Sequence, residues 1–430
     1  MNKIRQYLNT FVLTRGFLIA LLASAFIYLA WWGLSAPLLT TFLAIVALFL
    51  LLKSTPKVWF WSGFFIGILW FWWIGLSFNH YHMPWAIPLV ILLIALGYGL
   101  LFLAIAQVAH RVTAKIPTSI SPPIHSLIRL LIKSMGLLVL SYIHPFGFDW
   151  FKPELMFQES YLGTQKWQFA VILLGVALTH WRHCSIYLLL LGIAYQPTLP
   201  STPIPPRDIT ILSTKTPVSQ KWDTALQPAQ FAILLDHIDQ AIANHQRIII
   251  LPESVFPLFI NQTPTLLTKL QERAEKITIV TGGLYWDGKV PRNSTYIFSH
   301  SHITVANKVL LVPFGESNPL PDFLSDWVNE VFYDGAVDYQ ASSHVVDYRI
   351  DGVLYRNAIC FEATSELLYQ GSPKQMIVLS NNGWFVPSTE PTLQRLLLQY
   401  YSRKYHTTIY HAVNMSPSYL LQEGRVIWRE

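Results

Sequence analysis

Charge is scarce in this chain. Charged residues make up 13% of its 430 residues, against a usual share of about 25%, while hydrophobic residues reach 52%. A soluble protein of this composition would have too little charged surface to stay dispersed, so the composition argues against that class. The apolar residues crowd into 11–195, whereas most Asp and Glu residues follow residue 207. The chain therefore has an apolar half and a polar half.

Cysteine is nearly absent. Cys184 borders an apolar run and Cys360 lies in the polar half, a pattern that suits neither a disulfide scaffold nor a zinc site. The formal net charge is +6, but no basic cluster is interleaved with stacking aromatics, so we expect no nucleic-acid partner. No small-residue cleavage site follows the first apolar run, and we expect no cleaved signal peptide.

The apolar half contains seven runs that approach the length of a membrane-spanning helix, which is about 20 residues. We expect spans near residues 12–33, 36–52, 58–78, 85–109, 125–143, 167–181 and 184–198. With the N-terminus inside, the inner segments carry eight Lys or Arg residues and the outer loops two, as the positive-inside rule predicts. Seven spans place the polar half on the outer face, whereas six would place it in the cytoplasm.

The outer loop 144–166 begins with an aromatic-rich stretch, 144–150. Trp and Tyr gather generally at membrane interfaces, so an aromatic belt is the favoured interpretation. The alternative is a lip that guides lipid toward an active site.

Proline marks the boundary between the halves, because five of the ten residues 197–206 are proline, which cannot continue a helix. We predict a membrane domain over 1–198, a proline-rich linker over 199–206 and a second domain over 207–430. In that domain helical spacing covers 228–245 and 266–276, and strands are expected at 209–212, 247–251, 277–281, 295–298, 303–305, 353–360 and 376–380. Such alternation predicts an α/β sandwich. The stretch 418–429 has a mixed pattern.

Three chemically capable residues lie at or just beyond predicted strand ends, where α/β folds tend to place catalytic groups. They are Glu253, Lys308 and Cys360. A thiol with a pKa near 8.5 needs a base or a cation to ionise at neutral pH. A carboxylate can take its proton, and an ammonium can stabilise the oxyanion formed on an acyl carbonyl. Together they suit acyl transfer through a thioester.

Taken singly, each of the three has a plainer interpretation. A lone Cys at a strand end is more often a small buried core residue. A lone Glu is usually a loop residue, and a lone Lys is usually a surface charge. The hypothesis therefore depends on the sequence around them.

Those surroundings carry a resemblance. The segments Leu-Pro-Glu-Ser at 251–254, Val-Pro-Phe-Gly-Glu at 312–316 after Lys308, Cys-Phe-Glu at 360–362 and Ser-Asn-Asn-Gly-Trp-Phe at 380–385 resemble the nitrilase superfamily. Within it the chain is most similar to apolipoprotein N-acyltransferases. The resemblance implies a helical membrane bundle followed by a nitrilase-like α-β-β-α sandwich.

The resemblance also implies residue roles. Glu253 would be the general base, Lys308 the oxyanion-stabilising cation and Cys360 the nucleophile. Further residues match family positions around the triad: Glu316, Glu362 and Asn293 as supporting residues, and Trp222, Trp384 and Phe361 in substrate binding. Trp222 could instead pack a loop, and Glu362 could cap the helix after Cys360. Phe361 departs from the tyrosine that is common after the nucleophile.

The implied reaction takes an acyl group from a membrane phospholipid to the N-terminal diacylglyceryl-cysteine of an apolipoprotein. It needs no metal or organic cofactor. We expect a monomer in the bacterial inner membrane with its catalytic domain on the periplasmic face. Two alternatives stay open: a membrane-tethered nitrilase-like amidase, and a non-enzymatic membrane assembly component with a degenerate domain.

Overall fold

A computed structural model describes residues 9–117, 121–144, 148–182, 184–196, 206–300, 302–313, 315–316 and 339–430. The chain divides into two compact units. The first contains Met1–Pro145, Asp149–Pro200 and Pro387–Leu396, and the second contains Phe146–Phe148, Ser201–Val386 and Leu397–Glu430. The main division falls within the proline-rich stretch, of which 197–205 lie outside the described residues.

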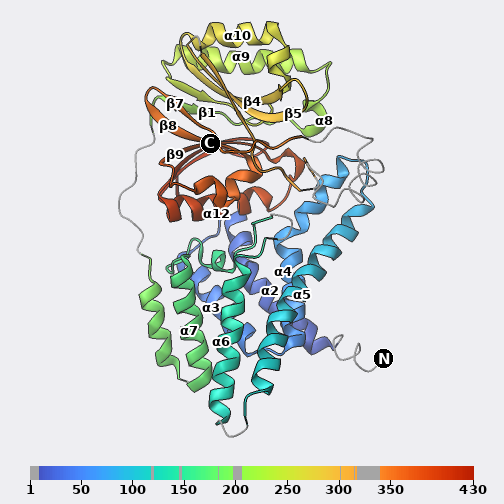
Figure 1. The fold of residues 1–430 in the computed structure, drawn as a ribbon, viewed down its shortest axis with the longest axis vertical. Coiled ribbons are helices and arrows are strands. Elements are labelled where there is room, and N and C mark those ends of the chain that lie inside the picture. The colour runs from blue at the N-terminus through green and yellow to red at the C-terminus, as the bar shows by residue number, and fades with distance from the viewer. Residues whose placement is uncertain are drawn as a thin grey trace. The chain divides into compact units, whose positions relative to one another are not determined.

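The first unit is built of apolar helices (Figure 1). They are α2 (Thr10–Trp31), α3 (Pro37–Lys53), α4 (Pro56–Phe71), η1 (Trp72–Asn79), α5 (Ala86–Ala114), α6 (Pro122–Leu140), η3 (Pro153–Phe157), α7 (Lys166–Arg182) and η4 (Ser185–Ala194). Proline occupies the first turn of α3, α4 and α6, where its missing N–H costs nothing and its fixed φ suits a helix. The side chain of Asn9 caps α2 by accepting from Phe11 N at 2.9 Å.

Among the described residues, four helices are long and apolar enough to cross a membrane. They cover Thr10–Trp31, Pro56–Asn79, Ala86–Ala114 and Pro122–Leu140. Pro37–Lys53 and Lys166–Arg182 are α-helices of 17 residues each. The stretch predicted as the last span, 184–198, instead holds the 3₁₀ helix η4, of 10 residues. At about 2 Å of rise per residue, helix η4 is shorter than the hydrocarbon core of a membrane, which is about 30 Å thick. The number of spans therefore stays a prediction.

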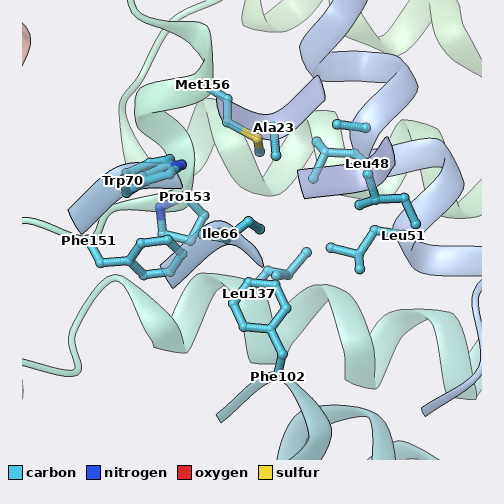
Figure 2. A pocket seen from close by; sticks show the side chains of 12 residues that line it. Ala23, Leu48, Leu51, Ile66, Trp70, Phe102, Leu137, Phe151, Pro153 and Met156 are labelled. Atoms are coloured by element: carbon cyan, nitrogen blue, oxygen red, sulfur yellow. The ribbon is translucent and has the colours of Figure 1, made fainter. Parts of the chain in front are cut away.

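Close helix packing leaves little empty space in this unit. A Cβ atom on Gly63 of α4 would lie 2.5 Å from Tyr98 O of α5, so only glycine permits this approach. Figure 2 shows one cavity of this unit, lined by apolar side chains that include Leu48, Trp70 and Phe151. Its volume is about 20 Å³, room for roughly one water-sized sphere. This cavity is too small for a fatty acyl chain.

The second unit contains two six-stranded sheets. The first has the order β1-β2-β4-β5-β6, with β3 paired to β4, and the second has the order β12-β11-β10-β9-β8-β7. The first sheet comprises β1 (Ile209–Ile211), β2 (Ile248–Ile250), β3 (Phe256–Phe259), β4 (Thr278–Trp286), β5 (Pro291–Ser299) and β6 (His302–Asn307). The second comprises β7 (Asp347–Ile350), β8 (Val353–Ile359), β9 (Gln375–Asn381), β10 (Thr408–Asn414), β11 (Tyr419–Gln422) and β12 (Arg425–Arg429).

Helices cover the outer face of each sheet, with α9 and α10 over the first and α12 over the second (Figure 1). The helices and 3₁₀ turns of this part are α8 (Val218–Lys221), α9 (Gln227–Ala243), η5 (Ile260–Gln262), α10 (Pro264–Ala274), η6 (Cys360–Thr364), η7 (Glu366–Tyr369), η8 (Asn382–Trp384) and α12 (Glu390–Tyr405). This arrangement confirms the predicted α-β-β-α sandwich.

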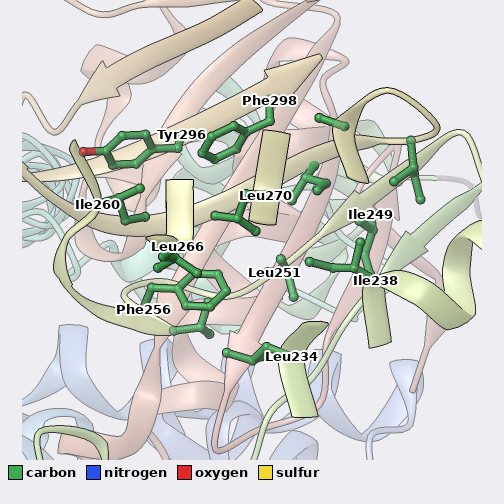
Figure 3. Close-up of a cluster of buried hydrophobic side chains, with 14 of the residues drawn as sticks. Leu234, Ile238, Ile249, Leu251, Phe256, Ile260, Leu266, Leu270, Tyr296 and Phe298 are labelled. Atoms are coloured by element: carbon green, nitrogen blue, oxygen red, sulfur yellow. The ribbon is translucent and has the colours of Figure 1, made fainter. Parts of the chain in front are cut away.

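The aliphatic run of β2 explains the layering. Ile249 packs with Leu234, Leu270 and Phe298 in the core between the first sheet and its helices (Figure 3). Its neighbours Ile248 and Ile250 belong to the core shared by the two sheets. Alternate residues of a strand point to opposite faces, so a strand buried on both faces is apolar throughout.

Most predicted strands are present, and the hairpin of β5 and β6 is confirmed. The strand predicted over 353–360 ends at Ile359, and Cys360 begins η6. Five strands, β3, β7, β10, β11 and β12, were not predicted. The mixed stretch 418–429 forms the antiparallel pair β11 and β12, in which β11 is mostly buried and β12 is half-exposed with polar residues at both ends.

Candidate active site

Glu253 is placed by a close backbone contact beyond the end of β2. A Cβ atom on Gly282 of β4 would lie 2.7 Å from Glu253 Cα and 2.4 Å from Ser254 N. Ser254 adopts a left-handed conformation with φ of 46°, which is uncommon for a residue other than glycine. The turn after β2 is therefore held tightly against β4, and the Glu253 side chain is 9% exposed.

Lys308 follows β6 and faces two carboxylates. Its backbone N–H donates to Asn293 O at 2.9 Å, and its carbonyl accepts from Ser342 N at 2.8 Å. Its ammonium Nζ lies 3.9 Å from Glu253 Oε1 and 2.7 Å from Glu316 Oε2. With 1% of the side chain exposed, water contributes little to solvating this charge.

Asn293 of β5 joins the two carboxylates. Its Nδ2 donates to Glu253 Oε1 and to Glu316 Oε1, each at 2.8 Å. Both carboxylates carry a charge of the same sign when ionised, so their approach is unfavourable without donors between them. Asn293 and Lys308 supply those donors, and Glu316 also accepts from Val312 N at 2.9 Å.

Cys360 lies at a sharp turn between β8 and η6. Its φ of 53° is left-handed, a conformation that costs a non-glycine residue about 1 kcal/mol or more, and the residue is partly exposed. Glu362 stabilises the turn, because its Oε1 accepts from Ile359 N at 2.8 Å. Its Oε2 accepts from Val309 N at 2.7 Å and Leu310 N at 3.1 Å. One carboxylate thus joins the Cys360 turn to the segment after Lys308.

Burial and charge shift the pKa values of these groups in different directions. Burial raises the pKa of Glu253, against the opposing effect of Lys308, and raises the pKa of Glu362 to about 7. Burial alone would lower the pKa of Lys308, but the charges of Glu316, Glu253 and Cys360 outweigh it and raise this pKa. Lys308 therefore stays protonated at neutral pH, while Glu253 is held closer to neutrality than a free carboxylate. A base of this kind can both take and return a proton.

The predicted substrate-binding residues differ in position. Phe361 is buried and stacks on Phe148, with ring centroids 5.7 Å apart and planes 8° apart. Phe148 comes from the loop before η3, so this aromatic-rich loop supplies at least one contact to the residue next to Cys360. Residues 145–147 of the loop lie outside the described residues. Trp222 follows α8 and is 41% exposed, and Trp384 ends η8 and is partly buried. A role for either tryptophan in substrate binding stays a prediction.

Sequence analysis missed Lys221. Its ammonium is buried, with the residue 2% exposed, and donates to Glu253 O at 2.8 Å. The sequence signal is weak, because a lysine at the end of a four-residue helix is normally a surface residue. Among the described residues, no group of three or more His, Cys, Asp or Glu side chains is arranged to hold a metal ion.

Comparison with known proteins supplies the family. Residues 10–196 match the model of the apolipoprotein N-acyltransferase integral membrane domain. The apolipoprotein N-acyltransferase of Wolinella succinogenes is 41% identical over 93% of this chain and 93% of its own length. That of Helicobacter pylori is 34% identical over 91% of this chain and 90% of its own length. The chain belongs to the apolipoprotein N-acyltransferase family.

The second unit of this apolipoprotein N-acyltransferase family member is also similar to solved structures. An amidase from Nesterenkonia sp. matches 54% of this chain and 89% of its own length, with 11% identity and a TM-score of 0.40. A CN-hydrolase superfamily protein from Xanthomonas campestris matches 52% of this chain and 85% of its own length, with 12% identity and a TM-score of 0.39. Family membership and the apolar helices make this chain an integral membrane protein.

Proposed function

We propose that this protein moves an acyl group from a membrane phospholipid to the N-terminal amine of a diacylglyceryl-cysteine apolipoprotein, by way of a thioester on Cys360. The observation that carries the proposal is the buried cluster in which Lys308 lies 3.9 Å from Glu253 and interacts electrostatically with Cys360. A base, a cation and a thiol in one water-poor site are the groups that thioester chemistry needs.

Each half-reaction uses the same three groups. In the first, Glu253 takes the Cys360 proton, the thiolate attacks the phospholipid ester carbonyl, and the ammonium of Lys308 stabilises the oxyanion. The ester C–O bond breaks, and Glu253 returns the proton to the departing lysophospholipid oxygen. In the second, the acceptor amine attacks the thioester and loses a proton to Glu253. The C–S bond breaks, and the thiol of Cys360 is restored.

The supporting residues act through these groups. Asn293 and Glu316 hold Glu253 and Lys308 at their separation. Glu362 holds the turn that carries the nucleophile. The expected location is the bacterial inner membrane, with the catalytic unit on the periplasmic face. The asymmetry of eight against two basic residues across the seven proposed spans supports that orientation.

The test is to incubate the purified protein in micelles with phospholipid and then determine the mass of the peptide that contains Cys360. We expect the mass of a fatty acyl group to be added, and to be lost as N-acylated lipopeptide appears. Cys360→Ala should lose both signals by at least about 1,000-fold, whereas Cys184→Ser should keep both. Continued transfer by Cys360→Ala would remove the proposal, and free fatty acid in place of N-acyl lipopeptide would indicate the amidase alternative.

A further inference from the structure

A second lysine lies beside the catalytic groups. Lys221 ends α8, is 2% exposed, and donates from its ammonium to Glu253 O at 2.8 Å. A buried ammonium is costly unless it is hydrogen-bonded and faces negative charge. Its place in the fold therefore calls for a physical reason.

The acceptor of this hydrogen bond is unusual. Glu253 O belongs to the peptide that precedes Ser254, whose φ is 46°, and the same turn is pressed against Gly282. The ammonium thus stabilises a strained turn that carries the general base. A lysine ammonium has three N–H donors, and within the described part of the chain one of them is used, in the hydrogen bond to this carbonyl. Two donors stay available for other oxygen or sulfur atoms.

The charge of Lys221 also reaches the thiol. The negative charges of Glu253 and of Cys360 both act on it, and they oppose the burial that lowers the pKa of Lys221 to about 8. The ammonium of Lys308 interacts with Cys360 as well. The carboxylates of Glu316, Glu253 and Glu362 also act on Lys308. Lys308 therefore faces the carboxylates of Glu316 and Glu253 at 2.7 and 3.9 Å, and the ammonium of Lys221 is a second cation, hydrogen-bonded to Glu253 O.

We infer that Lys221 is a positioning residue of the acyl-transfer site: it holds the main chain of Glu253 and acts with Lys308 as a second cation that favours the thiolate of Cys360. The inference deepens the proposed function, since it concerns the same nucleophile. The ammonium of Lys308 already faces the carboxylates of Glu316 and Glu253, so part of its positive charge is matched before the thiol ionises. A second ammonium supplies further positive charge for the thiolate.

The experiment measures thiolate formation directly and does not depend on acyl transfer. Full-length protein in micelles, carrying Cys184→Ser so that Cys360 is the one thiol, is alkylated with iodoacetamide from pH 5 to pH 9. Three variants are compared in this background: Lys221→Met, Lys221→Gln, and Lys269→Met as an exposed control in α10. Lys221→Gln can still donate to Glu253 O, so its fold should persist where that of Lys221→Met fails.

Both Lys221 variants should move the midpoint of the alkylation profile to higher pH by about one unit. At pH values below the parent's midpoint, alkylation should therefore slow about tenfold. Lys269→Met should keep the parent profile. A Lys221→Gln profile that coincides with the parent would overturn the inference. N-acylation of a lipopeptide is measured on the same samples. If the parent protein does not N-acylate the lipopeptide but the alkylation profile is still shifted in the Lys221 variants, the proposed function is wrong. The inferred effect of Lys221 on Cys360 would still hold.

Discussion

The two units bury charged side chains in different ways. In the membrane unit, two buried carboxylates have cationic partners: Lys152 donates to Asp149 at 2.7 Å, and Lys166 pairs with Glu154. Glu390, in the Pro387–Leu396 segment of this unit, is also buried, and burial raises its pKa to about 8. Lys133 instead donates to two backbone carbonyls, Leu52 O at 2.8 Å and Ser54 O at 2.7 Å. Each cation there meets acceptors that offset the cost of leaving water.

The second unit gathers several charged groups at one place. The carboxylates of Glu253, Glu316 and Glu362 act on the ammonium of Lys308, and the ammonium of Lys221 donates to Glu253 O. Such crowding keeps pKa values away from their usual range, which is useful where a proton must move. The comparison separates charges buried as one-to-one pairs from the crowded cluster at the proposed site. The predictions below test that distinction, from the largest expected effect to the smallest.

Removing the general base should have the largest effect. Glu253→Gln keeps the shape of the side chain but cannot take the thiol proton, so we expect formation of the acyl-enzyme to slow about 1,000-fold, equivalent to about 4 kcal/mol in the barrier. The rate is measured from the mass of the Cys360 peptide over time. Glu272→Gln, at an exposed glutamate of α10, is the matched control and should match the parent rate. An unchanged rate in Glu253→Gln would contradict the assignment of the base.

Breaking a matched pair in the membrane unit should affect stability. Lys152→Met removes the buried ammonium that pairs with Asp149, whose carboxylate keeps His144 Nε2 at 2.8 Å, and we expect a loss of about 3 kcal/mol in the free energy of unfolding. Denaturant unfolding in micelles gives this quantity. Arg273→Met, which breaks a partly exposed pair with Asp239, should cost less than about 1 kcal/mol. Acyl transfer per folded molecule should stay near the parent value in both variants. A loss of activity per folded molecule in Lys152→Met alone would contradict a purely structural role for this pair.

Glu362→Gln should loosen the connection between the nucleophile and the segment after Lys308. An amide presents one oxygen and one NH₂ group, so it cannot accept from Ile359 N on one side and from Val309 N and Leu310 N on the other. We expect about 2 kcal/mol of destabilisation and faster hydrogen exchange in 308–310 and 359–362. Hydrogen exchange with mass spectrometry measures this change, with exchange in β2 as the internal reference. Equal protection in the variant would show that the three hydrogen bonds do not hold the turn.

The smallest effect at neutral pH concerns a residue that affects stability in acid. His411 of β10 is buried and lies 2.7 Å from Ser380 Oγ through Nε2, and burial lowers its pKa to about 3. A folded-state pKa below the unfolded value of about 6.5 gives stability that is complete above pH 6.5 and is lost as pH falls. The expected slope is up to about 1.4 kcal/mol per pH unit between pH 6.5 and pH 3. His411→Gln should show a shallower decline of unfolding free energy over this window, and a slope equal to that of the parent would contradict the assignment.

The element pattern of the catalytic unit could be predicted where the residues have a clear period. The apolar run of β2 and the hairpin of β5 and β6 are both visible in the chain. The strands β11 and β12 were not predicted, because they are only 4 and 5 residues long and their pairing shifts register between Leu420 and Leu421. In the apolar half the limit was length: 184–198 is apolar enough to suggest a span, but η4 covers only Ser185–Ala194 as a 3₁₀ helix.

Local sequence determined the helices, most strands and the three candidate catalytic residues, because period, composition and short motifs act over a few neighbours. Only the tertiary structure decided the distances among side chains from β5, the turn after β2, the segment after β6 and η6. It also decided that Lys221 is buried against Glu253 and that Phe148 stacks on Phe361. These contacts join segments that are far apart in the sequence. Local sequence patterns extend over only a few neighbouring residues, so they do not predict such contacts.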